Sequence, residues 1–350
     1  MRAYSGPHSS AAMKVLFDHL QPFLLAHGGL QIQIEETKRA LEQIGVEVEF
    51  LRWWDEKQTG DIIHFFGRPW GANIDLAHSK NIRVVMSELL TGLGSRSAAA
   101  IAFQRTIIGL TKKWAPSEFW VRMGWDAYAK ADAIIALTNW EARLMRDVFR
   151  APVGRVTVIP NGVANEFLGR SEAAATPRGN YLVCSATITE RKRVLETAEA
   201  AVQAETPLHV LGKPYSHQDR YAQQFLALVK EHPAMIRYEG AIQDRSQLAQ
   251  IYRQARGFVL LSTKESLSLS ALEAAACECP LLLSDLPWAR TTFHDTAWYC
   301  PVTASIDKTA AALRSFYNAA PGLMAPRKPQ SWDEVARQLE TLYQRVLSAR

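Results

Sequence analysis

Short apolar runs alternate along this chain with longer stretches in which apolar residues recur at helical spacing. The apolar runs in the first half are VLFDHL (15–20), VEVEFL (46–51), DIIHFF (61–66), IRVVMS (82–87) and ADAIIALT (131–138). Helical spacing is found over 31–44, 98–131 and 140–149. Strands that alternate with helices, without hairpin signals, predict a parallel sheet covered on both faces.

The same alternation restarts after a change in composition. The stretch 164–180, ANEFLGRSEAAATPRGN, is rich in small residues and contains Pro177, so we interpret it as a linker. Five further apolar runs begin with NYLVCSA (180–186) and end with PLLLS (280–284), and a terminal helix is expected over 332–347. The predicted fold class is α/β, with two doubly wound Rossmann-like parallel-sheet domains over 13–165 and 166–325.

Composition narrows the protein class. The chain has 350 residues, which favours two domains, and 48% of them are hydrophobic. It has neither an apolar run long enough for a transmembrane helix nor a secretory signal. A net charge of +5 suits anionic small molecules or a negative membrane surface but does not require nucleic acid. The four cysteines lack C-x-x-C spacing, so we expect reduced, buried thiols and a cytoplasmic protein.

Two doubly wound domains place a ligand cleft at the carboxyl ends of their strands. Gly28 and Gly29 follow the first strand and precede a helix, where backbone amides can approach a phosphate. They are equally compatible with an ordinary turn, because the G-x-G-x-x-G pattern of a dinucleotide site is missing.

The stretch GFVLLSTKESLSLSALEA (257–274) carries the clearest chemical signal. A buried strand ends in a polar loop, and Glu265 and Glu273 are separated by seven residues. A helix that begins near Glu265 would present both carboxylates on one face toward the cleft. Free amides at the helix start could bind a diphosphate while a carboxylate one or two turns along binds ribose hydroxyls; alternatively, Glu265 caps the helix and Glu273 is solvated.

ESLSLSALEA resembles the glutamate-pair signature of retaining glycosyltransferases of family four, usually written E-G-F-G-L-P-x-L-E-A. Further segments resemble that family in the same order along nearly the whole chain. They are HGGLQIQIEETKRALEQIGVEVEF (27–50), ADAIIALTNWEARLM (131–145), VTVIPNGV (156–163), SATITERKRVLETAEA (185–200), YEGAIQDRSQLAQIYRQARGFVLLS (238–262), SDLPWAR (284–290) and SWDEVARQLETLYQRVL (331–347). The resemblance implies the GT-B fold, with an acceptor-side first domain, a donor-binding second domain and a final helix (330–350) that returns to the first.

The resemblance also implies roles for individual residues. Lys192 and Glu265 would be the catalytic residues, with Lys192 neutralising the departing diphosphate. Donor-binding positions would be Gly28, Gly29, Arg191, Arg193, Gly240, Ala241, Ile242, Ser266, Leu267, Ser268 and Glu273. The family needs no divalent metal for donor binding, and the sequence has no D-x-D motif in a suitable loop, so we expect no metal and no cofactor besides the nucleotide-sugar co-substrate.

This chain departs from the family pattern at several positions. The family places an arginine five or six residues before the lysine, where this chain has Ala186 and Thr187; Arg191 or Arg193 would have to supply the charge. The signature glycines are Ser266 and Ser268. Where the family often has a histidine, this chain offers only His64 after an earlier strand, and a lone histidine there is also typical of a structural role.

Segment 103–128 mixes aromatic and basic residues. This pattern suits a membrane surface or a lipid-linked acceptor, and equally a partly buried helix pair with a charged outer face. The sequence therefore predicts a retaining hexosyltransferase that uses a nucleoside-diphosphate sugar and a glycan or glycolipid acceptor, cytoplasmic or peripheral at the inner membrane face. The alternatives are a non-catalytic GT-B partner protein and a GT-B nucleotide-sugar epimerase.

Overall fold

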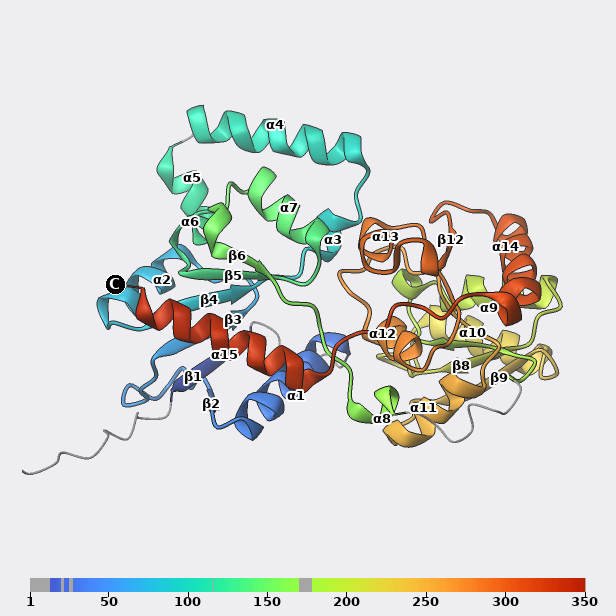
Figure 1. Ribbon diagram of the computed structural model, residues 1–350. Coiled ribbons are helices and arrows are strands. Elements are labelled where there is room, and N and C mark those ends of the chain that lie inside the picture. The colour runs from blue at the N-terminus through green and yellow to red at the C-terminus, as the bar shows by residue number, and fades with distance from the viewer. Residues whose placement is uncertain (1–12, 20–21, 25–27, 115, 170–177, 350) are drawn as a thin grey trace, which may run out of the picture.

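The computed structural model describes residues 13–19, 22–24, 28–114, 116–169 and 178–349. They form two side-by-side units, each built on a six-stranded sheet (Figure 1). The first twelve residues and positions 170–177 of the predicted linker lie outside the described residues.

The N-terminal sheet is parallel throughout. Its strand order is β2 (Glu47–Phe50), β1 (Lys14–His19), β3 (Ile62–Phe66), β4 (Arg83–Ser87), β5 (Ala133–Ala136) and β6 (Val156–Val158). One face packs on α1 (Gly29–Gln43) and α15 (Trp332–Ser348). The other packs on α2 (Gly71–Ser79), α6 (Ala127–Lys130) and α7 (Asn139–Asp147). Burial on both faces explains why the strands are continuous apolar runs.

The predicted helical region over 98–131 is broken into three helices. They are α4 (Ala98–Trp114), α5 (Ser117–Arg122) and α6. Pro116 is the N-cap of α5, and Gly124 has a φ of 64° that an L-residue rarely adopts, so the chain turns at both places. A one-turn helix, α3 (Thr91–Gly94), precedes α4.

The C-terminal sheet is also parallel. Its strand order is β12 (Trp298–Cys300), β11 (Leu281–Ser284), β10 (Gly257–Leu260), β7 (Leu182–Ser185), β8 (Leu208–Leu211) and β9 (Ile236–Gly240). Helices α11 (Arg245–Gln254), α12 (Leu269–Ala276) and α13 (Pro287–Phe293) cover one face. Helices α9 (Val194–Gln203), α10 (Arg220–Glu231) and α14 (Ile306–Ala319) cover the other. The predicted fold class of two doubly wound domains is confirmed.

The strand order of the C-terminal sheet reverses between β7 and β10. In doubly wound sheets the crevice outside the carboxyl ends of such a strand pair is the usual ligand site. The loops that follow β7 and β10 carry Lys192 and Glu265, so the topology itself brings these two residues together.

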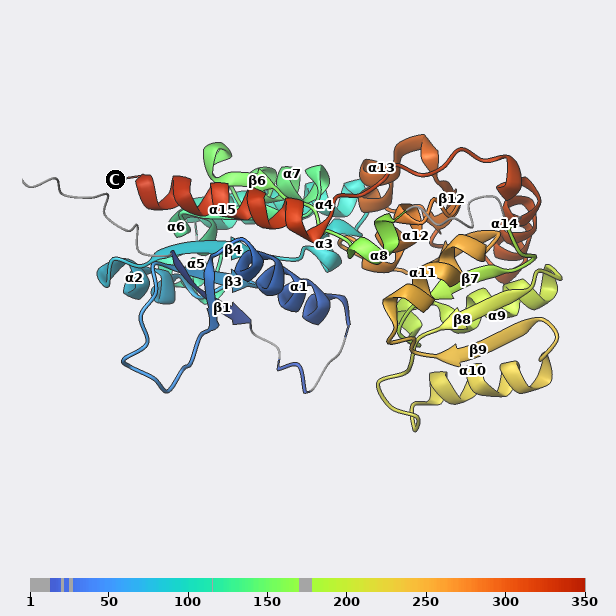
Figure 2. The same ribbon diagram turned by 60° about the horizontal axis from the view of Figure 1, so that its bottom comes forward.

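The segment before α15 returns to the N-terminal domain, and α15 lies along its sheet in both views (Figure 1, Figure 2). Its N-terminus is a capping box of Ser331 and Glu334. Tyr343 of α15 contacts His64 Nδ1 at 2.7 Å, and His64 Nε2 contacts Ser87 at 2.7 Å. Burial lowers the pKa of His64 to about 3, so this histidine is a neutral core residue.

Two loop regions differ from the expectation based on sequence. A short helix, α8 (Asn165–Leu168), lies within the predicted linker and buries Phe167 in the core of the C-terminal domain. The hydrophobic pattern also did not predict the three elements α13, β12 and α14. Among the described residues, no helix is both long enough and apolar enough to cross a bilayer.

Candidate active site

A cavity of about 800 Å³ lies between the two domains. It is lined by residues at the carboxyl ends of strands from both sheets: Leu137 after β5, Thr187 after β7, Lys213 after β8 and Glu265 after β10. The N-terminus of α1 and that of α12 also line it. Backbone amides at helix N-termini favour anions, so the cavity is suited to a phosphorylated ligand.

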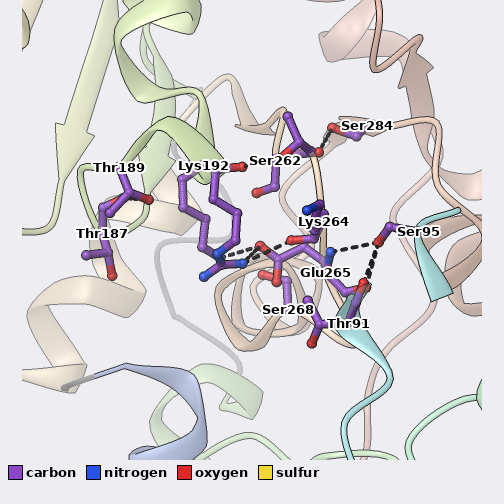
Figure 3. A network of polar contacts seen from close by, with 12 residues as sticks. Thr91, Ser95, Thr187, Thr189, Lys192, Ser262, Lys264, Glu265, Ser268 and Ser284 are labelled. Carbon is purple, nitrogen blue, oxygen red and sulfur yellow. Dashed lines mark hydrogen bonds and ion pairs between the residues drawn. The ribbon is translucent and has the colours of Figure 1, made fainter. Parts of the chain in front are cut away.

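Glu265 is a buried, ion-paired carboxylate of this cavity. Its side chain is 9% exposed, and its Oε1 accepts a hydrogen bond from Lys192 Nζ (Figure 3). Arg191 Nη1 lies 3.3 Å from the same oxygen and donates to the carbonyl oxygen of Lys264 at 2.9 Å. Two cations from the loop after β7 therefore converge on one carboxylate from the loop after β10.

Glu273 reaches the same cavity from α12. The predicted helix start near Glu265 is wrong: α12 begins at Leu269, because Ser268 is its N-cap and accepts a hydrogen bond from Ala271 N. Both glutamates still line the cavity, one from the loop and one from the second turn of the helix. Desolvation raises the pKa of Glu273 to about 7, opposed by the charge of Arg245 and a hydrogen bond from Tyr252.

Gly28 and Gly29 line the cavity from the N-terminal domain, across from the two glutamates of the C-terminal domain. Gly28 is the N-cap of α1 with φ 147°, a conformation that favours glycine. Gly29 faces α12: a Cβ there would lie 3.7 Å from the Leu269 side chain. Both glycines line the cavity.

The structure brings most of the predicted site residues together. Besides those above, Ala241, Ile242, Ser266, Leu267 and Ser268 line the cavity. Gly240 is not among the lining residues; it has φ 76°, and its carbonyl oxygen accepts a hydrogen bond from Gly212 N, so it shapes the turn after β9. Ser268 has φ −75°, so the serine that replaces a signature glycine needs no left-handed backbone.

Arg193 is not brought to the site. It adopts φ 51° at the start of α9, and its guanidinium donates to the carbonyl oxygens of Val302 and Ala304. Its side chain therefore points away from the cavity, whereas Arg191 lines it.

Sequence reasoning missed several cavity residues. Arg245 forms an ion pair with Glu36 of α1 across the two domains, and both line the cavity. Lys213 follows Gly212 at the end of β8. The signal for Lys213 was available, since a cation directly after a buried strand points to the ligand edge of a parallel sheet. The Glu36–Arg245 pair depends on how the domains meet, which no local pattern reveals.

Within the described ranges, no group of three His, Cys, Asp or Glu side chains is arranged to hold a metal ion. All four cysteines are buried and unpaired. Burial raises the pKa of Cys184, Cys277 and Cys279 to about 12, so these thiols are not activated nucleophiles.

Comparisons with known proteins agree with this architecture. The family described as Glycosyltransferase Family 4 matches residues 27–167, and Glycosyl transferases group 1 matches residues 170–339. The D-inositol 3-phosphate glycosyltransferase of Nocardiopsis dassonvillei is 25% identical over 309 residues, which cover 83% of this chain and 65% of that protein.

Two solved structures are similar in fold. The sucrose-phosphate synthase of Thermosynechococcus elongatus has a TM-score of 0.67 at 18% identity, covering 97% of this chain and 100% of that one. Anabaena HepE in complex with UDP and glucose has a TM-score of 0.62 at 15% identity, covering 95% and 100%.

Two facing doubly wound domains with a shared cavity at their carboxyl edges define a protein of the GT-B class. The first half of the chain carries a Glycosyltransferase Family 4 domain, and its second half carries a Glycosyl transferases group 1 domain. It spans 65% and 42% of the length of the two curated relatives that it matches.

Proposed function

We propose that the protein is a retaining hexosyltransferase that moves a sugar from a nucleoside diphosphate to a glycan or glycolipid acceptor. The observation that carries the proposal is the convergence of Arg191 and Lys192 on Glu265 in a cavity shared by both domains. A bound donor brings a diphosphate to these two cations. They then stabilise the negative charge that develops as the sugar leaves.

Other cavity residues contact different parts of the donor in this proposal. Glu273 accepts hydrogen bonds from ribose hydroxyls, and backbone groups of Ala241 and Ile242 meet the base. The helix start at Gly28 and Gly29 closes on the phosphates from the acceptor side. Without a clear nucleophile, we expect the diphosphate to depart and the acceptor to attack on the same face of the sugar. Donor binding is proposed to need no metal ion, because lysine, arginine and helix amides supply the positive field.

Relatives support a nucleotide-sugar donor. A solved structure of Anabaena HepE contains UDP-glucose, and the curated relatives are named as glycosyltransferases. The first experiment is a thermal-shift comparison of UDP, GDP and ADP, because a ligand that binds only the folded state raises its melting temperature. No shift with any of the three contradicts the proposed donor site.

Donor turnover separates the alternatives. Release of the nucleoside diphosphate, accelerated by a glycan or lipid acceptor, supports the transferase. A thermal shift without turnover supports a non-catalytic GT-B partner protein, and an epimerised sugar product supports an epimerase.

The acceptor side has an exposed apolar stripe on α4. Phe103, Ile107, Leu110 and Trp114 recur at helical spacing and are 68%, 41%, 53% and 76% exposed. Phe103 and Ile107 also line a cavity with Trp125, so part of the stripe borders a hollow of the N-terminal domain. Residues 98–114 contain three basic residues and no acidic one. An apolar stripe on a helix with a net positive charge suits an anionic bilayer, so we propose that α4 rests on a membrane that presents the acceptor.

Vesicle flotation tests this partner. Wild-type protein should float with vesicles that contain phosphatidylglycerol, and Phe103→Ser with Leu110→Ser should reduce the floated fraction. Leu76→Ser is the matched control, because Leu76 is 62% exposed on α2, away from α4. Equal flotation of both variants contradicts the assignment.

A further inference from the structure

The loop that carries Glu265 is held from the opposite domain. Ser95, which follows α3, accepts a hydrogen bond from Glu265 N at 3.3 Å. Its own hydroxyl donates to the carbonyl oxygen of Thr91 at 2.9 Å (Figure 3). The backbone of a proposed catalytic residue is thus tied to the acceptor-side domain.

The next residue of the loop makes a second link. Ser266 Oγ donates to a carboxylate oxygen of Glu141, which lies on α7 of the N-terminal domain. Glu141 is 1% exposed, and its two carboxylate oxygens accept from Leu90 N and Leu137 N, each at 3.0 Å. The N-terminal domain therefore fixes Glu141 by itself, and the Ser266 hydroxyl is an additional donor from the other domain.

Apolar contacts follow in the same loop. Leu267 belongs to the hydrophobic cluster that contains Leu137. Leu269 belongs to the cluster of Val15 and Phe17 in the N-terminal domain. Four of the five residues from 265 to 269 are thus connected to the acceptor-side domain.

We propose that Ser266 and Glu141 are a positioning pair that sets the loop geometry of Glu265 when the two domains are together. Ser266 replaces a glycine of the signature that this chain resembles, and a glycine has no hydroxyl to donate. A charge-assisted hydrogen bond between buried groups is directional and comparatively strong. The pair therefore couples the arrangement of the donor loop to the acceptor-side domain.

The role in catalysis rests on the proposed transferase activity, so the test has one part that needs no substrate. Urea unfolding of the wild type, Ser266→Ala, Glu141→Gln and the double variant forms a double-mutant cycle. We expect a coupling of about tenfold in the unfolding equilibrium constant, as for a hydrogen bond to a charged group. Additive effects would show that the bridge is not formed in solution and would overturn the proposal.

The second part uses the nucleoside diphosphate, among UDP, GDP and ADP, that gives the largest thermal shift, and the corresponding glucose donor. Ser266→Ala should lower kcat/KM for the donor by about tenfold. It should leave the Kd of the free nucleoside diphosphate unchanged. Glu141→Gln combined with Ser266→Ala should cost no more than the larger single effect.

Ser284→Ala is the matched control. Ser284 is also buried, and its Oγ donates to the carbonyl oxygen of Ser262 at 2.6 Å, in the same loop region but within one domain. It should leave kcat/KM near the wild-type value. An equal loss in Ser284→Ala, or unchanged kcat/KM in Ser266→Ala, overturns the positioning role. If none of the nucleotides binds, the proposed function fails, while the urea cycle still decides whether the bridge exists.

Discussion

Arg191 Nη1 lies 3.3 Å from the Glu265 oxygen that also accepts the hydrogen bond from Lys192 Nζ. Two positive charges thus share one buried carboxylate in the cavity. In the proposed donor complex, the diphosphate would compete with Glu265 for both cations, because it carries more negative charge than one carboxylate. We propose that Arg191 supplies the charge for which the resembled family uses an arginine further upstream.

Arg191 and Arg193 should respond differently to substitution. Arg191→Ala removes a cation that lines the cavity, and we expect a loss of about 10- to 100-fold in kcat/KM, as for a charge-assisted hydrogen bond. Arg193→Ala removes two contacts to backbone carbonyls away from the cavity, so we expect a lower melting temperature with nearly unchanged kcat/KM. Steady-state kinetics and thermal unfolding of both variants are the measurements. The reverse pattern would show that Arg193 is the phosphate cation.

Periodicity predicted the doubly wound sheets because their buried strands are continuous apolar runs between amphipathic helices. The motif placed Glu265 and Glu273 at the correct sheet edge. It did not predict that α12 starts at Leu269, because a serine cap competes with the longer helical pattern. Contacts such as Glu141 with Ser266 connect residues 125 positions apart. They follow from domain packing, and no local pattern contains them.

Glu273→Ala should weaken donor binding by roughly 1–3 kcal/mol, because ribose hydroxyls lose a charged acceptor. Titration calorimetry with the nucleotide that binds gives the Kd. Glu340→Ala, at a half-buried position of α15 that does not line the cavity, is the control and should not change it. Unchanged affinity in folded Glu273→Ala would contradict the ribose contact.

Donor affinity should rise with pH through about 7, the raised pKa of Glu273. Desolvation favours the protonated carboxyl in the free protein, whereas ribose hydroxyls that donate hydrogen bonds favour the ionised form. Binding therefore lowers the pKa of Glu273 and releases a proton, so the Kd of the donor should be larger at pH 6 than at pH 8. Calorimetry in buffers of different ionisation enthalpy measures the proton release, and Glu273→Gln should abolish it. An identical pH profile in Glu273→Gln would assign the titration to another group.

Transfer activity should survive EDTA. The proposed donor site relies on Lys192, Arg191 and helix-terminal amides for its positive field, and the described residues form no metal-binding group. The measurement is initial rate with and without chelator, using protein dialysed beforehand. Complete loss of activity that Mg²⁺ or Mn²⁺ restores would overturn metal independence.

Lys192 should be the residue on which turnover depends most. As the sugar–phosphate bond breaks, negative charge grows on the diphosphate, and the cavity holds Lys192 in place because its ammonium group is bound to Glu265 and its side chain is only 13% exposed. A preorganised cation needs little reorganisation to stabilise the charge of the transition state. Removing one such group typically lowers kcat by about 10²–10³. We therefore expect that loss for Lys192→Ala, a smaller loss for Lys192→Arg, which keeps the charge, and none for Lys230→Ala on the exposed last turn of α10. Circular dichroism of each variant verifies folding. If Lys192→Ala keeps more than about half of the wild-type kcat, far from the expected loss, Lys192 does not neutralise the leaving diphosphate.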